Sequence, residues 1–256
     1  MWIRPLVFMI VLCAMLVAQR LKPKREASGS RQRYVANGGI FCIGILVVQL
    51  IEPIAVVAAS IFAQKHNFGL FNILEWHTVI EYLICIVLLD LAIYFQHVAT
   101  HKVPMLWSLH RVHHYDTEVD VSTALRFHPV EIVLSMIYKS LCVVLLGVPL
   151  VAVVIFEVLL NALAMFNHAN LGLPRSFDRI LRRLVVTPDM HVVHHSQVIS
   201  DSDSNFGFGL SCWDRIFKTY VGKPEAGFQN LNIGQAEVSQ KQAVSLRGLL
   251  SSPFKR

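Results

Sequence analysis

Histidines at short, regular intervals are the residues of this sequence best suited to chemistry. Of the twelve histidines in the 256-residue chain, five lie between positions 97 and 114. They form one H-x-x-x-H pair and one H-x-x-H-H group, and "TPDMHVVHHS" contains a second H-x-x-H-H group. The eight side chains are those of His97, His101, His110, His113, His114, His191, His194 and His195.

Spacings of three and four residues bring side chains to one face of an α-helix. Each histidine group would therefore point its imidazoles in one direction if its segment is helical. Thr187 and Pro188 favour the start of such a helix before the last group, as N-cap and first-turn residue. Neutral imidazole is a strong ligand for iron, zinc and copper. Because eight imidazoles exceed what one ion binds, the pattern predicts two metal ions that share a site.

Other metal chemistries fit the pattern less well. A zinc protease of the H-E-x-x-H type needs a glutamate directly after its first histidine, and Val98 occupies that position here. A haem protein would use only one or two axial histidines. A non-oxidative zinc protein, either a hydrolase or a metal carrier, is the alternative, because zinc accepts the same ligands. No histidine group contains the carboxylate base that a hydrolase would need.

Membrane helices are the elements that must position these histidines. The chain is 54% hydrophobic and 16% charged, with a mean hydropathy of +0.52. Apolar stretches at 2–18, 39–62, 71–95 and 130–166 approach or exceed the roughly twenty residues that a membrane-spanning helix requires. The last is too long for one crossing, and Gly147 and Pro149 predict a helical hairpin within it. We therefore expect an all-α integral membrane protein with about four to five membrane helices.

The basic residues predict the orientation of these helices. Six lysines and arginines lie within residues 20–33 against the single acid Glu26, which favours a cytoplasmic loop. The basic residues follow the first apolar segment, so we expect an uncleaved anchor rather than a signal peptide. Alternating crossings then bring His97, His168 and His191 to the cytoplasmic side. Nucleic-acid binding is disfavoured, because the basic residues flank apolar spans.

Two polar stripes run from the membrane helices toward the histidines. One continues the H-x-x-x-H pair backwards through Tyr94 and Asp90, and the other joins Glu157 and Asn161 to His168 at helical spacing. Acids inside membrane helices are costly and usually face the interior of the bundle. Asp90 and Glu157 are predicted either to orient Tyr94 and Asn161 behind the metal ligands or to link the helices to one another.

The sequence resembles the fatty acid hydroxylase and sterol desaturase superfamily of membrane histidine-box proteins. The three histidine boxes occur in the order of that family, and only eight residues, 102–109, separate the first two. The segments "RFHPVE", "FNHANL", "TPDMHVVHH" and "DSNFGFGLSCWDRIFKTY" agree as well. The resemblance covers residues 90 to 220. Two positions depart from the family pattern: Val98 replaces a common arginine, and Lys218 replaces the glycine of a closing F-G-T-Y.

The resemblance implies a dinuclear centre, normally of iron, under a cytosolic helical cap above the membrane helices. It implies O2-dependent hydroxylation or desaturation of a sterol, fatty acyl, sphingolipid or related lipid, with zinc as a possible substitute metal. By matching position, His168 is an additional ligand. His128 of "RFHPVE" is either a further ligand or the cap of a helix.

The remaining segments leave no room for a fused redox module. We expect membrane anchor helices in 1–70, the catalytic domain in 71–222 and a polar tail in 223–256. Electrons would then come from a separate reductase, ferredoxin or cytochrome-type donor, docking near residues 20–33 or 175–183. The expected location is a bacterial inner membrane, with the histidine boxes on its cytoplasmic side.

Overall fold

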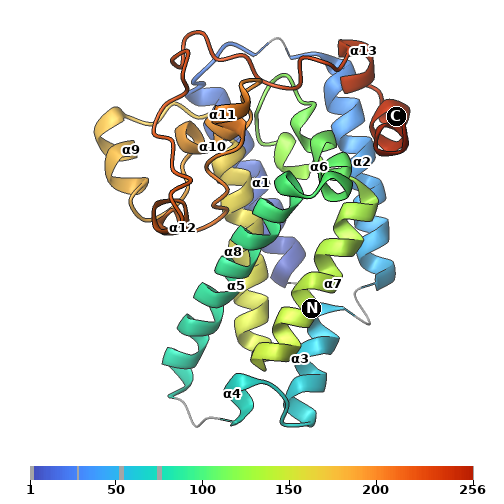
Figure 1. Ribbon diagram of the computed structural model, residues 1–256, viewed down its shortest axis with the longest axis vertical. Helices are drawn as coiled ribbons and strands as arrows, with labels where there is room; N and C mark the ends of the chain where they lie inside the picture. Colours follow the sequence, from blue (N-terminus) through green and yellow to red (C-terminus); the bar gives the residue numbers. More distant parts are fainter. Residues whose placement is uncertain (1–2, 28, 52–54, 74–76, 256) are drawn as a thin grey trace.

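Helices make up almost all of the ordered structure of this chain. The computed structural model describes residues 3–27, 29–51, 55–73 and 77–255, and within these ranges the only β-structure is three isolated bridges. In Figure 1 long helices extend through the lower part of the molecule, and short helices with loops form a cap in the upper part, where the long N-terminal helices, in blue, run alongside them. The prediction of an all-α protein is confirmed.

Five stretches of the described chain are long and apolar enough to cross a membrane. The second of them contains α2 (Arg31–Ile51), α3 (Val56–Lys65) and α4 (Leu70–Ile73). The other four are α1 (Ile3–Leu21), α5 (Thr78–Lys102), α7 (Pro129–Leu146) and α8 (Leu150–His168). The chain is therefore a multi-pass membrane protein, as its composition predicts.

The hairpin predicted within 130–166 is confirmed as α7 and α8. Gly147 ends α7 with φ +73° and donates its N–H to the carbonyls of Val143 and Val144. A Cβ at this position would collide with the Asn72 side chain and the Phe68 carbonyl, so both the backbone angle and the space require glycine. The loop before α4 thus packs directly on the turn of the hairpin.

Two helix boundaries differ from the expectation. α2 begins at Arg31 rather than near 39, because the buried guanidinium of Arg33 pairs with Asp116 at 2.5 Å and Asp120 at 2.8 Å. Its charge is neutralised inside the protein, so the basic segment continues the helix. α5 spans Thr78–Lys102 rather than 71–95, and it continues through the first histidine box, as the helical spacing of Asp90, Tyr94, His97 and His101 predicts. Trp2, the expected start of the first helix, lies outside the described residues.

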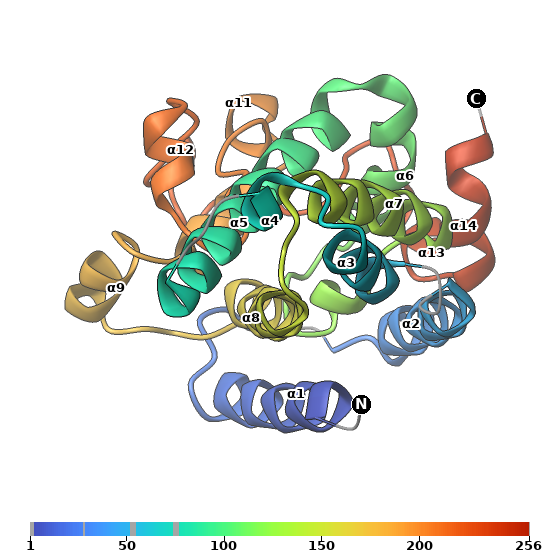
Figure 2. The ribbon, with the colours of Figure 1, turned by 90° about the horizontal axis from the view of Figure 1, so that it is seen from below.

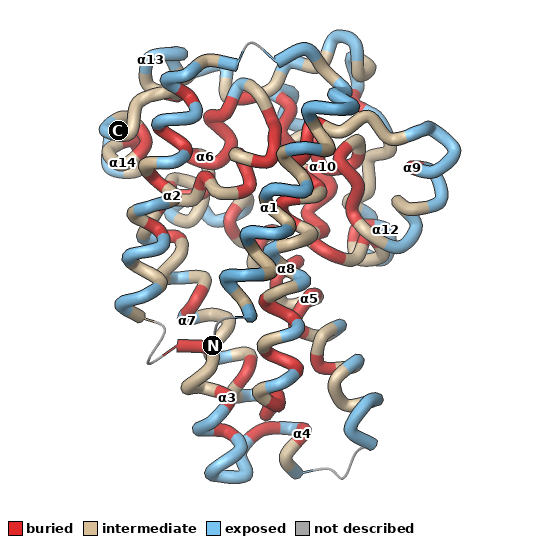
Figure 3. The backbone as a smooth tube through the Cα atoms, turned by 180° about the vertical axis from the view of Figure 1, so that it is seen from behind, coloured by how far each residue is buried: buried red, intermediate tan, exposed pale blue. Residues whose placement is uncertain are grey.

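The cap consists of short helices between and after the long ones. Viewed from below, α1 lies beside α8 at one edge of the bundle, and α2 lies on another side near α14 (Figure 2). Buried chain gathers around α6, α10 and the neighbouring end of α8, whereas no residue of α1 is buried (Figure 3). The polar interior of the molecule is therefore in the cap. Its helices are α6 (Pro104–His114), η2 (Thr123–Leu125), α9 (Arg175–Leu181), α10 (Pro188–His194), α11 (Ile199–Ser202), α12 (Cys212–Ile216), α13 (Gln240–Ala243), α14 (Leu246–Ser251) and η3 (Ser252–Phe254).

Candidate metal centre

The ends of four helices bring the histidines together. The first box lies at the end of α5, the second at the end of α6, the third in and directly after α10, and His168 is the last residue of α8. Pro104 and Pro188 each start one of the cap helices, where a missing N–H costs no helical hydrogen bond. The predicted helix start at Pro188 is confirmed. The Thr187 hydroxyl does not cap it and donates instead to Asp178 Oδ1 at 2.6 Å.

The imidazoles divide into two groups, each with ligand atoms within 4.8 Å of one another. His101 is half-buried, and the other members are buried. All eight box histidines and His168 belong to one group or the other. The first group is His97, His101, His110, His114 and His194, and the second is His113, His168, His191 and His195.

Each H-x-x-H-H box supplies ligands to both groups. His110 and His114 belong to the first group, whereas His113 belongs to the second. The third box is arranged in reverse, because His194 belongs to the first group and its two companions to the second. On a helix, residue i+3 lies about 60° to one side of residue i, and residue i+4 about 40° to the other. One short helix can therefore contact two ions, which the sequence pattern alone did not reveal.

Hydrogen bonds fix which ring nitrogen faces the centre. The Nδ1 atoms of His97, His168 and His194 lie 2.7 to 2.8 Å from the backbone carbonyls of Phe206, Ala164 and Ser204. A nitrogen that binds a carbonyl must carry the proton, so the other nitrogen of a neutral ring is an acceptor. These rings therefore present unprotonated Nε2 atoms to the interior of the site.

The distances between these nitrogens fit bound cations. His168 Nε2 lies 3.0 Å from both His113 Nε2 and His191 Nε2. Ligands about 2.1 Å from one ion, separated by roughly 90 to 110°, are about 3.0 to 3.4 Å apart. Buried imidazole nitrogens of His101, His114 and His194 have no hydrogen-bond partner among the described residues. Such atoms are costly unless they bind a ligand, so the residues present fit a metal centre.

Burial keeps the imidazoles of the cap in their neutral form. Burial, reinforced by the neighbouring imidazoles, lowers the pKa values of His113, His114 and His195 well below the usual value. Burial likewise lowers the pKa of His194 to about 3. Metal ions bind only the neutral imidazole. The cap therefore holds these side chains ready for metal binding at neutral pH.

Glu131 is a functional residue that sequence reasoning missed. Its Oε1 lies 2.6 Å from His110 Nδ1, in place of the backbone carbonyl that the other rings use. A carboxylate behind a ligand histidine fixes the orientation of the ring and raises its basicity. Its position in the sequence could have indicated this role. Glu131 ends the segment "RFHPVE" and lies in the first turn of the helix that starts at Pro129.

His128 stands apart from both metal-binding groups. Its Nδ1 accepts the N–H of Val130 at 3.2 Å, and its Nε2 lies 3.3 Å from the Leu250 carbonyl. This side chain caps the start of α7. His128 was expected to be either a further metal ligand or a helix cap. Its position is that of a helix cap, and it belongs to neither imidazole group.

The polar residues below the first box link α5 to the cap. Asp90 Oδ2 accepts hydrogen bonds from Leu210 N at 3.0 Å and from Trp213 Nε1 at 2.8 Å. The Tyr94 hydroxyl lies 2.9 Å from Thr219 Oγ1. Asp90 therefore does not orient Tyr94. Both side chains hold the segment that begins at Phe206, whose carbonyl binds His97, so their effect on the ligand is indirect.

A cavity of about 370 Å³ extends from the histidines into the bundle. His97, His110 and Glu131 line it near the cap, and Lys139 and Glu157 line it further along α7 and α8. Its remaining walls are largely apolar, with Ile93, Ile132, Met136, Leu160 and Phe208 among them. Glu157 and Asn161 face this cavity and not the metal ligands. Asn161 donates to the backbone carbonyl of Glu157 at 2.7 Å.

The comparison with protein families agrees with this geometry. The model of the fatty acid hydroxylase family matches residues 82–219, which include every histidine of the two groups. This match covers more than half of the chain, and the protein belongs to the fatty acid hydroxylase family. No solved structure matches the chain significantly.

Curated relatives share 24 to 29% of their aligned residues with this chain. An ornithine lipid hydroxylase of Rhizobium tropici is 24% identical over 71% of this chain and 53% of its own length. The alkylglycerol monooxygenase of Homo sapiens is 29% identical over 62% of this chain and 34% of its own length. That of Caenorhabditis elegans is 25% identical over 75% and 38%. The chain thus spans about a third to a half of the length of these relatives.

Proposed function

We propose that this protein is a membrane-bound oxygenase that uses two iron ions and O2 to hydroxylate or desaturate a lipid. The observation that carries the proposal is the pair of buried imidazole groups at one end of a largely apolar cavity. The names of the relatives, a lipid hydroxylase and alkylglycerol monooxygenases, support a lipid substrate. The family membership supports oxidative chemistry over the zinc hydrolase or carrier alternative.

The proposed ligands are the two groups as the structure assembles them. His97, His110 and their partners would hold one ion, and His113, His168 and their partners the other. Iron in such a site would supply the power to activate O2 and oxidise a C–H bond. The protein keeps the imidazoles neutral and orients them through backbone carbonyls and Glu131. The cavity walls exclude water and place the hydrocarbon beside His97 and His110.

The electron donor would be a separate reductase, ferredoxin or cytochrome-type protein on the cytoplasmic side. The basic residues 20–33 support this sidedness by the positive-inside rule.

We propose a bacterial inner membrane as the location. We also propose the division into anchor helices (1–70), catalytic domain (71–222) and C-terminal tail (223–256). Within the tail, Leu246 of α14 lies over Gly39 of α2.

Metal analysis combined with lipid analysis tests this function. Protein purified without oxygen should contain close to two iron ions per chain, and lipid-dependent O2 consumption should follow addition of reductant. Mass spectrometry of lipid extracts should show the gain of an oxygen atom for hydroxylation, or the loss of two hydrogens for desaturation. A single tightly held zinc ion that survives replacement of both His110 and His191 by alanine, with no O2 consumption, would contradict the proposal.

A further inference from the structure

Lys139 places an ammonium group in the wall of the cavity, within a helix that is apolar enough to span the membrane. Its side chain is 16% exposed. The one ion pair that it forms among the described residues is a contact of 3.8 Å between Nζ and Glu157 Oε1. This distance exceeds a hydrogen bond, which for such a charged pair is about 2.7 to 2.9 Å. Lys139 thus lines the cavity without an acceptor at hydrogen-bond distance among the described residues.

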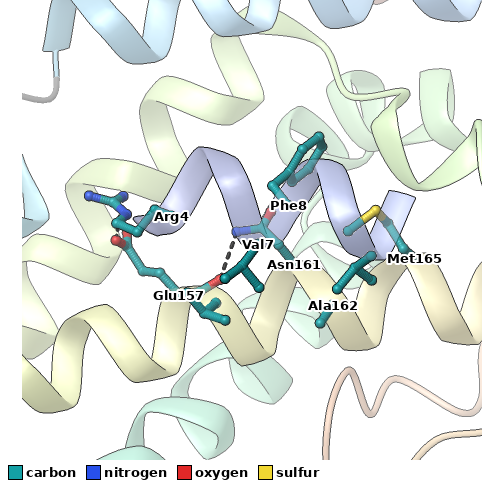
Figure 4. Close-up of a pocket in the computed structure, with 9 residues that line it drawn as sticks. Arg4, Val7, Phe8, Glu157, Asn161, Ala162 and Met165 are labelled. Atoms are coloured by element: carbon teal, nitrogen blue, oxygen red, sulfur yellow. Dashed lines mark hydrogen bonds and ion pairs between the residues drawn. The ribbon is translucent and has the colours of Figure 1, made fainter. Parts of the chain in front are cut away.

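Glu157 does not neutralise Lys139 closely, because it has a nearer partner. Its Oε2 lies 2.5 Å from Arg4 on α1, and Figure 4 shows this pair with Asn161 one turn further along α8. A charged amine in a membrane interior is costly and usually marks a partner or a substrate path. The observed geometry therefore leaves a site for an oxygen-bearing ligand beside Lys139, with Arg4 close by.

The walls of the cavity are polar at its two ends and mainly apolar between them. Glu131 and Lys139 lie eight residues apart on α7, which is about 12 Å along the helix. Ile132, Met136 and Leu160 line the space between the histidines and the lysine. This arrangement suits a molecule with a charged group at one end and a hydrocarbon chain that reaches the metal centre.

We propose that Lys139 binds the anionic oxygen group, a carboxylate or a phosphate, of a single-chain lipid substrate. The hydrocarbon of that lipid extends along the cavity to His97 and His110. This inference rests on the proposed function in naming the bound lipid as a substrate. The binding itself requires only the cavity and the charge of Lys139.

The same geometry predicts where the lipid is oxidised. Lys139 lies eight residues after Glu131, whose carboxylate contacts His110, so the proposed anion site is about 12 Å along α7 from the metal centre. An extended chain advances roughly 1.2 Å per bond. The oxidised carbon should therefore lie about 10 bonds from the anionic group, well away from the polar end.

Ligand binding to the metal-loaded protein in detergent tests the inference without turnover. The melting temperature is followed without oxygen or reductant as hexadecanoate, hexadecyl phosphate, hexadecan-1-ol or inorganic phosphate is added. We expect at least one of the two anionic lipids to raise it more than the alcohol. Inorganic phosphate alone should have little effect, because it lacks the chain that fills the apolar section. Protection by inorganic phosphate equal to that by hexadecyl phosphate would overturn the assignment to a lipid.

Three variants separate a role in binding from a role in folding. Lys139→Met should weaken the anionic lipid at least about tenfold and leave the alcohol unchanged, whereas Lys139→Arg should retain most of the binding. Lys65→Met removes an exposed lysine from α3 and serves as the matched control. Equal binding of the anionic lipid by wild type and Lys139→Met would overturn the inference. So would equal protection by the alcohol.

The two proposals can fail separately. Binding that depends on Lys139 in a protein that oxidises no lipid would refute the oxygenase function and leave the anion site. Oxidation of a neutral lipid at a rate that Lys139→Met does not change would refute the anion site and leave the oxygenase function.

Discussion

His113 and His114 are neighbours in the sequence but belong to different imidazole groups of the candidate metal centre. Their ring planes are nearly perpendicular, at 86°, and the ring centroids are 5.5 Å apart. His113 contacts His168, with an Nε2 separation of 3.0 Å, whereas the centroid of the His114 ring lies 4.8 Å from those of His101 and His194, which belong to the other group. The boundary between the two groups therefore runs between two adjacent residues of one helix.

Paired alanine substitutions should reveal this division. His114→Ala with His194→Ala removes two ligands of the first group, and we expect the metal content to fall to about half, because the second group keeps its complete ligand set. His113→Ala with His194→Ala removes one ligand from each group and should weaken both ions. Metal content measured after dialysis against graded chelator separates the cases. Identical release curves for the two pairs would contradict the assignment.

Removal of the Glu131 carboxylate should weaken the first ion. Glu131→Ala deprives His110 of the partner at 2.6 Å that orients the ring, and we expect a loss of about 10 to 100-fold in affinity for that ion. Glu131→Gln keeps an oxygen acceptor and should lose less. Chelator competition measures both variants, with the exposed Glu237→Gln as control. An affinity unchanged in Glu131→Ala would show that the hydrogen bond has no role in metal binding.

Lys218 is a strained departure from the family pattern. It adopts φ +62°, a left-handed conformation in which a side chain is unfavourable, and its side chain is exposed. Lys218→Gly should therefore stabilise the protein by up to about 1 kcal/mol, measured as a rise in melting temperature.

Asn205 provides the matched comparison for this substitution. It also has positive φ, at 50°, but its amide donates to the carbonyls of Met190 and Val221 at 2.9 and 2.8 Å. Asn205→Gly should destabilise, because the buried Met190 carbonyl and the partly buried Val221 carbonyl would both lose their donor. If both substitutions raise the melting temperature, the backbone angle alone governs the two positions.

Asp214 should make the stability of the cap depend on pH. Burial raises its pKa to about 6 from the ordinary 3.8, although Thr219 and the Gly207 N–H donate hydrogen bonds to it. A raised carboxyl pKa means that folding favours the protonated form. The free energy of unfolding should therefore fall as pH rises from about 4 to 6, by at most about 3 kcal/mol. Asp214→Asn should reduce this dependence of the unfolding free energy on pH, measured by thermal melts between pH 4 and 6. An unchanged pH dependence would show that other groups cause it.

Accessibility labelling should place the two ends of the bundle on opposite sides of the membrane. In a variant without native cysteines, cysteines introduced at the exposed Thr117 and Ser200 should react only with reagent on the cytoplasmic side. A cysteine at Gln64, near the end of α3, should react only from the other side. Labelling of position 117 or 200 from the side that labels 64 would overturn the proposed orientation.

The helical fold and the clustering of the histidines were predictable from the sequence because both depend on local spacing. Gly147 and Pro149 interrupt an apolar run, and the three boxes repeat at helical intervals, so the hairpin and the clustering of histidines followed directly. The division into two groups depends on how α5, α6, α8 and α10 meet, which no local spacing contains. The same holds for Glu131, whose role exists only because α7 packs against the end of α6.

Polar residues in the membrane segments were harder to interpret. Asp90 and Glu157 were identified correctly as unusual, but their partners, Trp213 and Arg4, come from distant parts of the chain. The sequence gives no sign that Lys139 faces a cavity, because a single lysine in an apolar helix can equally extend to the lipid surface. The role proposed for Lys139 depends on the cavity, which forms only when α2, α5, α7 and α8 pack together.

The interleaving of ligands along α6 and α10 has a consequence for how the protein acquires its metals. Either ion, once bound, orders helices that also carry ligands for the other, so the conformational entropy of ordering them is lost only once. The second ion should then bind more tightly than the first, and half-loaded molecules should be rare at substoichiometric metal. The two sites would then fill as a unit.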